Sequence, residues 1–93
     1  MMRGDVMIQK AIEAMHGDTR YRILKEVADA QKITPTDLIA KFKLTQPAVS
    51  RQIGFLRNAQ LIKCEKHGRN LYYSINESGI NAFMTRFRSE FIR

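Results

Sequence analysis

Apolar residues recur three and four positions apart along most of the chain, which is the pattern of helices that bury one face. Before residue 61 this spacing predicts helices over 6–15, 18–31, 35–42 and 45–60. The second helix places Ile23, Leu24, Val27 and Ala28 on one face. The fourth places Val49, Ile53, Leu56 and Gln60 along one stripe. Each of these faces is expected to turn towards a shared core.

Two of the helix starts have a physical cause in the sequence. Thr34 can cap a helix, Pro35 has no amide hydrogen to leave unpaired, and Asp37 suits the positive end of the helix dipole. Thr45 is a second capping residue, and only a few residues separate it from the preceding helix. Two short helices joined by so short a turn indicate a helix-turn-helix.

The period of the pattern changes after residue 60. Residues 61–66 alternate loosely, 67–70 are turn-like, and 71–75 alternate with β-favouring Tyr72 and Tyr73, so we predict a β-hairpin with a basic tip. Asn76 can then cap a last helix over 77–92. The expected fold class is mainly α with one β-hairpin, in the order four helices, two strands and a fifth helix.

Composition limits the chain to one domain, and its charge indicates a partner. With 93 residues, of which 44% are hydrophobic, the chain can bury one modest core, so residues 1–93 are expected to form a single domain. The formal net charge is +7, and residues 41–70 hold 7 basic side chains against 1 acidic one. This concentration favours a polyanionic partner, either nucleic acid or an acidic membrane surface.

The sequence favours a cytoplasmic protein with no membrane partner. Charged residues interrupt the first 15 positions, so they form neither the apolar segment of a secretory signal nor a run of about 18 apolar residues. The lone Cys64 excludes an intramolecular disulfide and a multi-cysteine metal cage, which fits a reducing compartment.

The predicted helix over 45–60 has a short, polar outer face. When Val49 and Ile53 point inward, Arg51 points outward, and such side chains can enter the major groove of DNA. There, Gln46 or Gln52 can pair with adenine, Arg51 with guanine, Ala48 with a thymine methyl group, and Thr45 or Ser50 with phosphates or base edges. The residues expected to contact DNA are Lys43, Thr45, Gln46, Ala48, Ser50, Arg51, Gln52, Lys66, His67, Arg69 and Asn70. An ordinary solvated surface remains the alternative for each.

Three stretches together resemble a known family. They are Thr19-Arg20-Tyr21-Arg22-Ile23-Leu24, Gln46-Pro47-Ala48-Val49-Ser50-Arg51-Gln52-Ile53, and Gly68-Arg69 followed by Tyr72-Tyr73-Ser74-Ile75. In this order they resemble the winged-helix repressors of the ArsR/SmtB family. The resemblance implies a winged helix-turn-helix fold and a homodimeric repressor that reads DNA with residues 45–57. Residues 66–70 would be the wing, and the first and last helices would form the dimer interface.

The chain departs from the family pattern at a few positions. Gln60 stands where many members have glycine, Gly54 where lysine is frequent, and Asp18 where proline often precedes Thr-Arg. These departures affect the helix ends and one phosphate contact.

The family's usual metal motifs are missing from this sequence. Residues 33–37 lack the Cys-x-Cys pair, and residues 77–93 contain no His or Cys. His16 and His67 are better interpreted as surface residues, and no metal or cofactor is expected. Cys64, in phase with Ile62, is interpreted as a half-buried apolar residue, with an oxidation sensor as the alternative.

The last helix carries an aromatic stripe that the core of so small a chain does not need. We therefore predict that residues 5–16 and 77–92 form a twofold dimer interface. Its apolar residues would be Ile8, Ile12, Ile80, Phe83, Met84, Phe87 and Phe91. Alternatively, this stripe covers the core of one subunit. A dimer places two reading helices about one turn of DNA apart, so the expected operator is an inverted repeat.

The sequence therefore favours a DNA-binding transcriptional regulator, most simply a repressor, with double-stranded DNA as its partner. The alternative is a winged-helix module that binds a protein and has no DNA preference. An enzyme is not expected, because no nucleophile–base pair, phosphate-binding glycine loop or carboxylate pair stands at a useful spacing. A small-molecule or protein effector is not identified by the residues, and activation of transcription is an alternative to repression.

Overall fold

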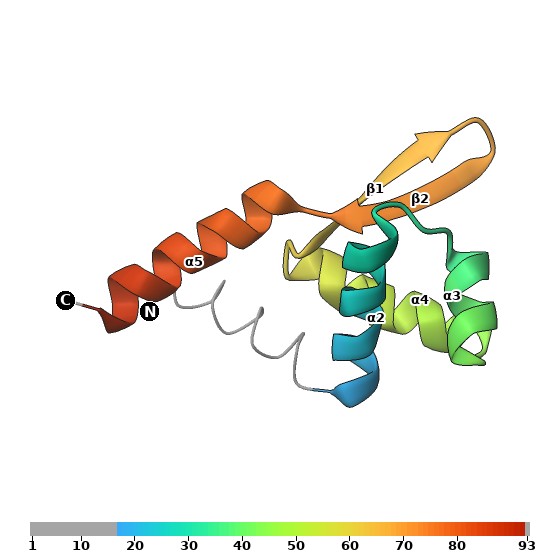
Figure 1. Ribbon diagram of the computed structural model, residues 1–93, viewed down its shortest axis with the longest axis horizontal. Helices are drawn as coiled ribbons and strands as arrows, with labels where there is room; N and C mark the ends of the chain where they lie inside the picture. The colour runs from blue at the N-terminus through green and yellow to red at the C-terminus, as the bar shows by residue number, and fades with distance from the viewer. Residues whose placement is uncertain (1–16, 93) are drawn as a thin grey trace.

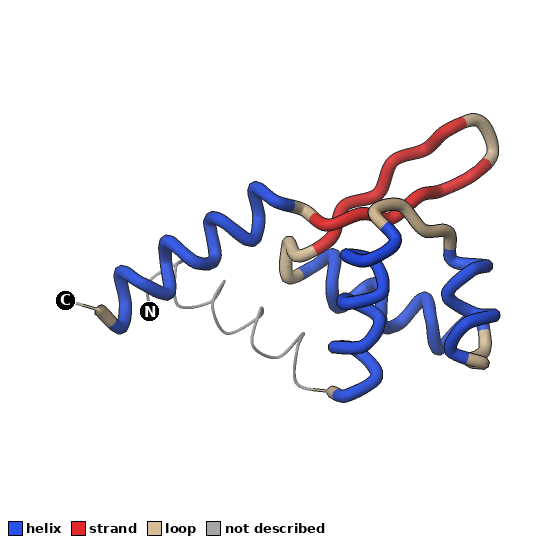
Figure 2. The backbone as a smooth tube through the Cα atoms, in the orientation of Figure 1, coloured by secondary structure: helices blue, strands red, loops and turns tan. Residues whose placement is uncertain are grey.

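The computed structural model describes residues 17–92 and confirms the expected fold class. The elements are α2 (Asp18–Ala30), α3 (Pro35–Phe42), α4 (Gln46–Asn58), β1 (Ile62–His67), β2 (Asn70–Ile75) and α5 (Glu77–Phe91). Four helices, not five, lie in the described residues, and the helix expected over 6–15 lies outside them. Figure 2 shows the hairpin as the one stretch of paired strands beside the described helices.

The helix-turn-helix begins each of its helices as the sequence predicts. At α3 the Thr34 side chain accepts a hydrogen bond from the Asp37 amide (3.1 Å), and the Asp37 carboxylate accepts one from the Thr34 amide (3.4 Å). This is a capping box, with Pro35 in the first turn. At α4 the Thr45 hydroxyl accepts from the Ala48 amide at 3.3 Å. These bonds pair amide groups that an uncapped helix leaves open.

The hairpin is antiparallel, with Ile62 opposite Ile75 and His67 opposite Asn70. Each strand reaches one residue further towards the tip than predicted, because the turn itself needs only two residues, and β1 begins at Ile62, one residue later than predicted. Gly68 adopts φ +63° there, a conformation that glycine allows without strain.

A further backbone contact joins the hairpin to the helices. Ile33, between α2 and α3, pairs with Tyr73 through two backbone bonds: the Ile33 amide donates to Tyr73 at 3.0 Å, and the Tyr73 amide donates to Ile33 at 2.8 Å. Because of this bridge, β2 pairs with β1 on one side and with Ile33 on the other. Tyr73 itself is buried. The sequence pattern did not predict this contact.

The core lies where α2, α3 and α4 meet the base of the hairpin. Its largest fully buried side chains are Ile23, Val27, Leu38, Val49 and Leu56. The prediction of a buried position was wrong for two residues, Ala28 and Gln60. Ala28 is exposed, since the turn of α2 leaves it at the edge of the buried face. Gln60 is exposed and lies beyond α4, which ends at Asn58, and it adopts φ +65°.

Helix α5 extends away from the body formed by α2–α4 (Figure 1). Asn76 caps it as predicted, accepting a hydrogen bond from the Gly79 amide at 3.1 Å. Ile80 packs against the core of its own chain, whereas the apolar residues further along α5 lie outside that core.

Candidate nucleic-acid interface

Helix α4 presents a polar face at its N-terminal end because three of its apolar residues are buried in the core. Val49, Ile53 and Leu56 are buried, which turns Arg51 to the exposed side of the helix. Thr45, Gln46, Ser50 and Arg51 are exposed, and Ala48 is half-buried. The predicted reading residues at the N-terminal end of α4 are therefore accessible, as contact with the edges of bases requires.

Gln52 differs from the other predicted reading residues. It is half-buried, and its side-chain oxygen accepts a hydrogen bond of 2.8 Å from Nε of Arg20 on α2. Gln52 therefore lies where α4 meets α2, and its amide oxygen is engaged within the protein.

Phe55 and Arg20 are the residues that the sequence reasoning missed. Phe55 is 39% exposed, and the Arg20 guanidinium lies 3.9 Å from the centre of its ring. The Arg51 guanidinium lies 6.0 Å from the same ring. The spacing of Arg51 and Phe55, four residues apart on one helix, is a signal that could have indicated their contact. The sequence carried no such signal for Arg20.

The hairpin tip brings together the other predicted DNA contacts. Lys66, His67, Arg69 and Asn70 are all exposed there. Lys43 is also exposed, in the turn between α3 and α4, where it adopts φ +53°. Exposed cations in these positions can contact phosphates without reading sequence.

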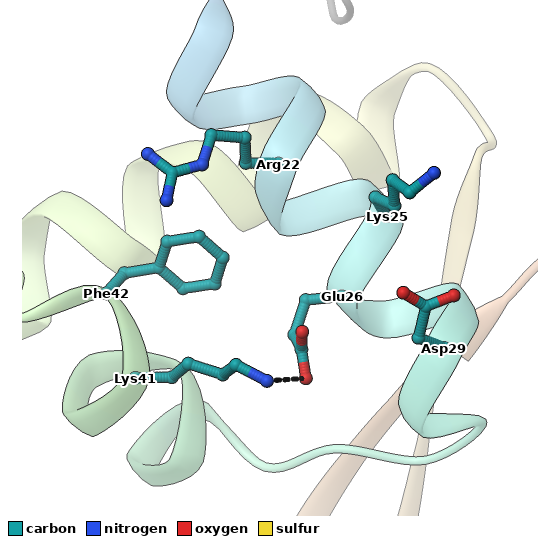
Figure 3. Close-up of a pocket in the computed structure, with 6 residues that line it drawn as sticks. All are labelled: Arg22, Lys25, Glu26, Asp29, Lys41 and Phe42. Atoms are coloured by element: carbon teal, nitrogen blue, oxygen red, sulfur yellow. Dashed lines mark ion pairs between the residues drawn. The ribbon is translucent and has the colours of Figure 1, made fainter.

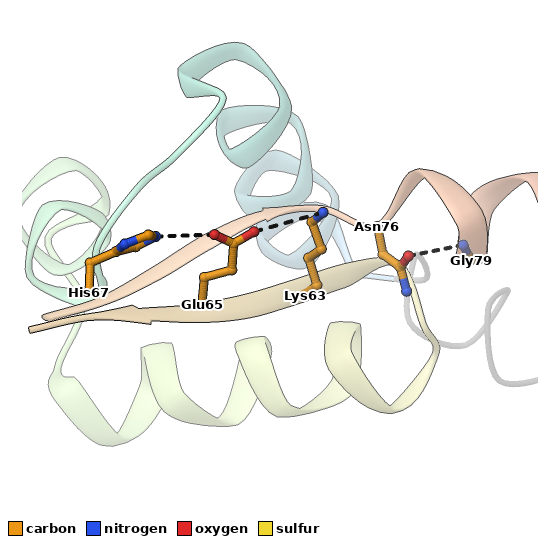
Figure 4. Close-up of polar contacts among 5 residues, drawn as sticks. All are labelled: Lys63, Glu65, His67, Asn76 and Gly79. Atoms are coloured by element: carbon orange, nitrogen blue, oxygen red, sulfur yellow. Dashed lines mark hydrogen bonds and ion pairs between the residues drawn. The ribbon is translucent and has the colours of Figure 1, made fainter.

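The one carboxylate of the hairpin contacts His67 and Lys63 (Figure 4). Glu65 contacts His67 Nε2 at 3.1 Å and Lys63 Nζ at 3.9 Å. The hydrogen bond from His67, followed by the charge of Lys32, lowers the pKa of the Glu65 carboxyl below its usual 4.5. The His67 ring also meets the Tyr72 ring edge-on, with centroids 5.6 Å apart.

A shallow groove of about 290 Å³ lies between α2 and α3 (Figure 3). Its lining is of mixed charge: Arg22, Lys25, Glu26, Asp29, Lys41 and Phe42. Lys41 Nζ pairs with Glu26 Oε2 at 2.8 Å, and the Arg22 guanidinium lies 5.6 Å from the Phe42 ring. These contacts join the first helix of the helix-turn-helix to α2.

Helix α5 carries the apolar row predicted for a dimer interface. Met84 is 56% exposed, Phe87 38% and Phe91 65%, whereas Phe83 is half-buried. Neighbouring rings of the row contact one another, with centroids 5.8 Å apart for Phe83 and Phe87 and 4.8 Å apart for Phe87 and Phe91. The predicted interface residues Ile8 and Ile12 lie outside the described residues.

Cys64 is half-buried on β1, directly opposite Tyr73. Burial, together with the neighbouring Cys64, raises the pKa of the Tyr73 phenol above 10.0. Within residues 17–92, no three His, Cys, Asp or Glu side chains lie together as metal ligands would. His16 lies outside this range. No helix among the described residues is long and apolar enough to cross a membrane.

Comparison with known proteins places this arrangement in a family. The model of the bacterial regulatory proteins of the arsR family matches residues 17–63, which contain α2, α3 and α4. The chain is 34% identical over 67 residues to a transcriptional repressor SmtB homolog of Synechocystis, a match that covers 72% of this chain and 50% of that protein. It is 32% identical over 73 residues to the HTH-type transcriptional regulator MJ1325 of Methanocaldococcus jannaschii, covering 74% and 82%.

A solved structure shares the fold. The ArsR-like transcriptional regulator from Rhodococcus sp. RHA1 superposes with a TM-score of 0.78 at 20% identity, covering 91% of this chain and 78% of that one. The chain spans about half the length of the Synechocystis relative. The matching family consists of transcriptional regulators and not of enzymes. The capped helix-turn-helix, the hairpin and the matching family model together assign this chain to the ArsR family of bacterial regulatory proteins.

Proposed function

We propose that this chain is a transcriptional repressor that binds an inverted-repeat DNA operator as a homodimer. The observation that carries the proposal is the exposed polar face of α4. This helix comes directly after a tight turn and is capped by Thr45. It lies in the segment 41–70, which contains 7 basic side chains and 1 acidic one, and that acidic side chain contacts Lys63 and His67. A basic segment around an exposed reading helix is typical of proteins that bind DNA.

Each exposed side chain has a role that follows from its chemistry. Arg51 would donate two hydrogen bonds to one guanine, Gln46 would pair with adenine, and Ala48 would contact a thymine methyl group. Thr45 and Ser50 would bond phosphates or base edges. The cations of the turn and the hairpin would contact phosphates. In this proposal residues 1–93 are one winged-helix domain, which works in the cytoplasm.

The dimer proposal is supported by the apolar row on α5. Met84, Phe87 and Phe91 are exposed together on one helix, and such a row normally marks a contact with another protein. A twofold partner would cover it with the same residues of a second copy. Residues 5–16 and 77–92 are the segments proposed for this interface. A dimer would in turn set two α4 helices on successive turns of one DNA face.

The experiment is selection of bound sequences from a random pool of duplex DNA at physiological salt. The Arg51→Ala variant is run beside the unmodified protein. We expect an inverted repeat that is bound about 10³-fold or more tightly than random DNA, and the loss of one base preference in each half-site for the variant. No enrichment with the unmodified protein would contradict the proposal and favour a module that binds another protein. An enriched single half-site would contradict the dimer only.

A further inference from the structure

Two guanidinium groups from different helices lie over one partly exposed aromatic ring, one of them close to it and the other further away. The Arg20 guanidinium, on α2, is 3.9 Å from the centre of the Phe55 ring, and the Arg51 guanidinium, on α4, is 6.0 Å from it. Phe55 is 39% exposed, so this ring is not a core side chain. A cation within about 6 Å of a ring centre is attracted by the negative face of the ring. Arg20 occupies the close position and Arg51 the outer limit.

Gln52 fixes the position of Arg20. Arginine has hydrogen-bond donors and no acceptor, so the amide atom that meets Arg20 Nε at 2.8 Å has to be the oxygen. A paired contact with adenine needs that oxygen as an acceptor as well as the amide nitrogen as a donor. Gln52 is half-buried and its oxygen already serves Arg20. Its geometry therefore suits support of Arg20 better than base reading.

The position of Arg20 has a consequence for Arg51. Because Arg20 lies over the ring at close range and repels a second cation, its charge opposes a closer approach of Arg51 to Phe55. The Arg51 guanidinium lies over the same ring at 6.0 Å from its centre, so the ring still attracts it, which limits the conformations of a long side chain. A side chain restricted in this way loses less entropy when it binds a base.

We propose that Phe55, Arg20 and Gln52 form a platform that positions Arg51 for base recognition. The platform is defined by these three residues, which act through Arg51 and read no base themselves. The inference rests on the proposed function, since it requires that Arg51 reads a base in the DNA operator.

Phe55→Leu and Phe55→Tyr are matched variants that test the platform. Leucine keeps an apolar side chain and removes the ring, whereas tyrosine keeps the ring. With the full chain and the selected operator, we expect Phe55→Leu to lose about threefold to tenfold of the discrimination at the base that Arg51→Ala affects. We expect Phe55→Tyr to retain it. Binding to random duplex DNA should be unchanged in both variants, because in this proposal the ring contacts no phosphate. Phe55→Leu should lower the melting temperature only slightly, since the ring is partly exposed.

A double-mutant cycle of Phe55 and Arg51 measures whether the two side chains act together on base discrimination, which a merely structural role of Phe55 would not produce. Phe55→Leu should have no further effect on base discrimination when Arg51 is already alanine. Arg20→Gln should relax the same base preference as Phe55→Leu. The platform is contradicted if Phe55→Leu discriminates as the unmodified protein does, or if it weakens all sequences equally in parallel with a lower melting temperature. If the unmodified protein selects no sequence, the proposed function itself fails, which is a separate result.

Discussion

The backbone of Gly79 lies directly against the carbonyl oxygen of Gln60, so closely that a β-carbon at position 79 would overlap that oxygen. Gly79 stands in the first turn of α5, and Gln60 stands just beyond the end of α4. Two hydrogen bonds fix the same junction: the Asn76 amide donates to the Leu61 carbonyl at 2.9 Å, and the Gly79 amide donates to the Asn76 side chain at 3.1 Å. This junction sets where α5 leaves the helix-turn-helix body.

Gly79→Ala should destabilise the protein by about 1–3 kcal/mol, because the added methyl group meets backbone that cannot move without shifting α5. Denaturant unfolding at a fixed protein concentration measures this. The matched control is Gly54→Ala, in the middle of α4, where a β-carbon meets nothing within 4 Å. That change should stabilise the protein by about 0.5–1 kcal/mol through helix propensity. Equal effects of the two variants would contradict the close contact.

Gln60→Gly should raise the stability by about 0.5–1 kcal/mol. Gln60 adopts φ +65°, which L-residues disfavour and glycine does not, and its exposed side chain loses little on removal. Gln60→Ala is the control, since alanine keeps the β-carbon and should change the stability by less than about 0.5 kcal/mol. Thermal unfolding measures both, with about 4–8 °C expected per kcal/mol in a domain of this size. A lower melting temperature for the glycine variant would show that the conformation carries no strain.

Glu65 should titrate below 4.5, and His67→Ala should bring its pKa back towards that value. The hydrogen bond from His67 is the largest cause of the lowered pKa. Because the folded-state pKa is depressed, the associated stability is present above the unfolded pKa and is lost as the pH falls through the folded value. Carboxyl chemical shifts followed by NMR during an acid titration measure the pKa in both proteins. An unchanged pKa in the variant would assign the shift to the lysines instead.

Arg69→Ala should weaken binding to all DNA sequences about equally and should reduce the slope of log affinity against log salt by about 1. Arg69 is exposed at the hairpin tip, where a cation can meet phosphate. Affinity is measured at several salt concentrations for the selected operator and for random duplex DNA. Loss confined to the operator would contradict a phosphate contact and indicate base reading by the hairpin.

Phe87→Glu should convert the proposed dimer to a monomer and lower operator affinity with it. Phe87 lies in the middle of the exposed apolar row on α5, and a carboxylate there would lose its hydration in an interface. Arg88→Glu is the control, since it adds negative charge at an exposed neighbour outside the row. Light scattering coupled to gel filtration measures the mass of each. If Phe87→Glu remains dimeric, the subunits meet through a different surface.

Local chemistry made most of the fold predictable. The capping of α3 by Thr34, of α4 by Thr45 and of α5 by Asn76 depends on residues at most three positions apart, and all three predictions are confirmed. The inward faces built on Val27 and Ile53 are confirmed as well, because helix periodicity alone defines them. The errors are Ala28, which lies at the edge of the buried face of α2, and Gln60, which lies beyond the end of α4, where the packing of other elements decides how far a helix continues.

In the candidate site, too, features that depend on neighbouring residues were predictable from the sequence, and contacts between distant residues were not. The sequence by itself determined the family pattern, the exposed face of α4 and the basic hairpin tip, because neighbouring positions in one helix or one turn fix them. Only the tertiary structure decided that Gln52 accepts a hydrogen bond from Arg20, that the Arg20 guanidinium lies over the Phe55 ring, and that Ile33 pairs with Tyr73. Arg20 and Gln52 are 32 positions apart, and a contact between such distant residues depends on the packing of two helices around a shared core.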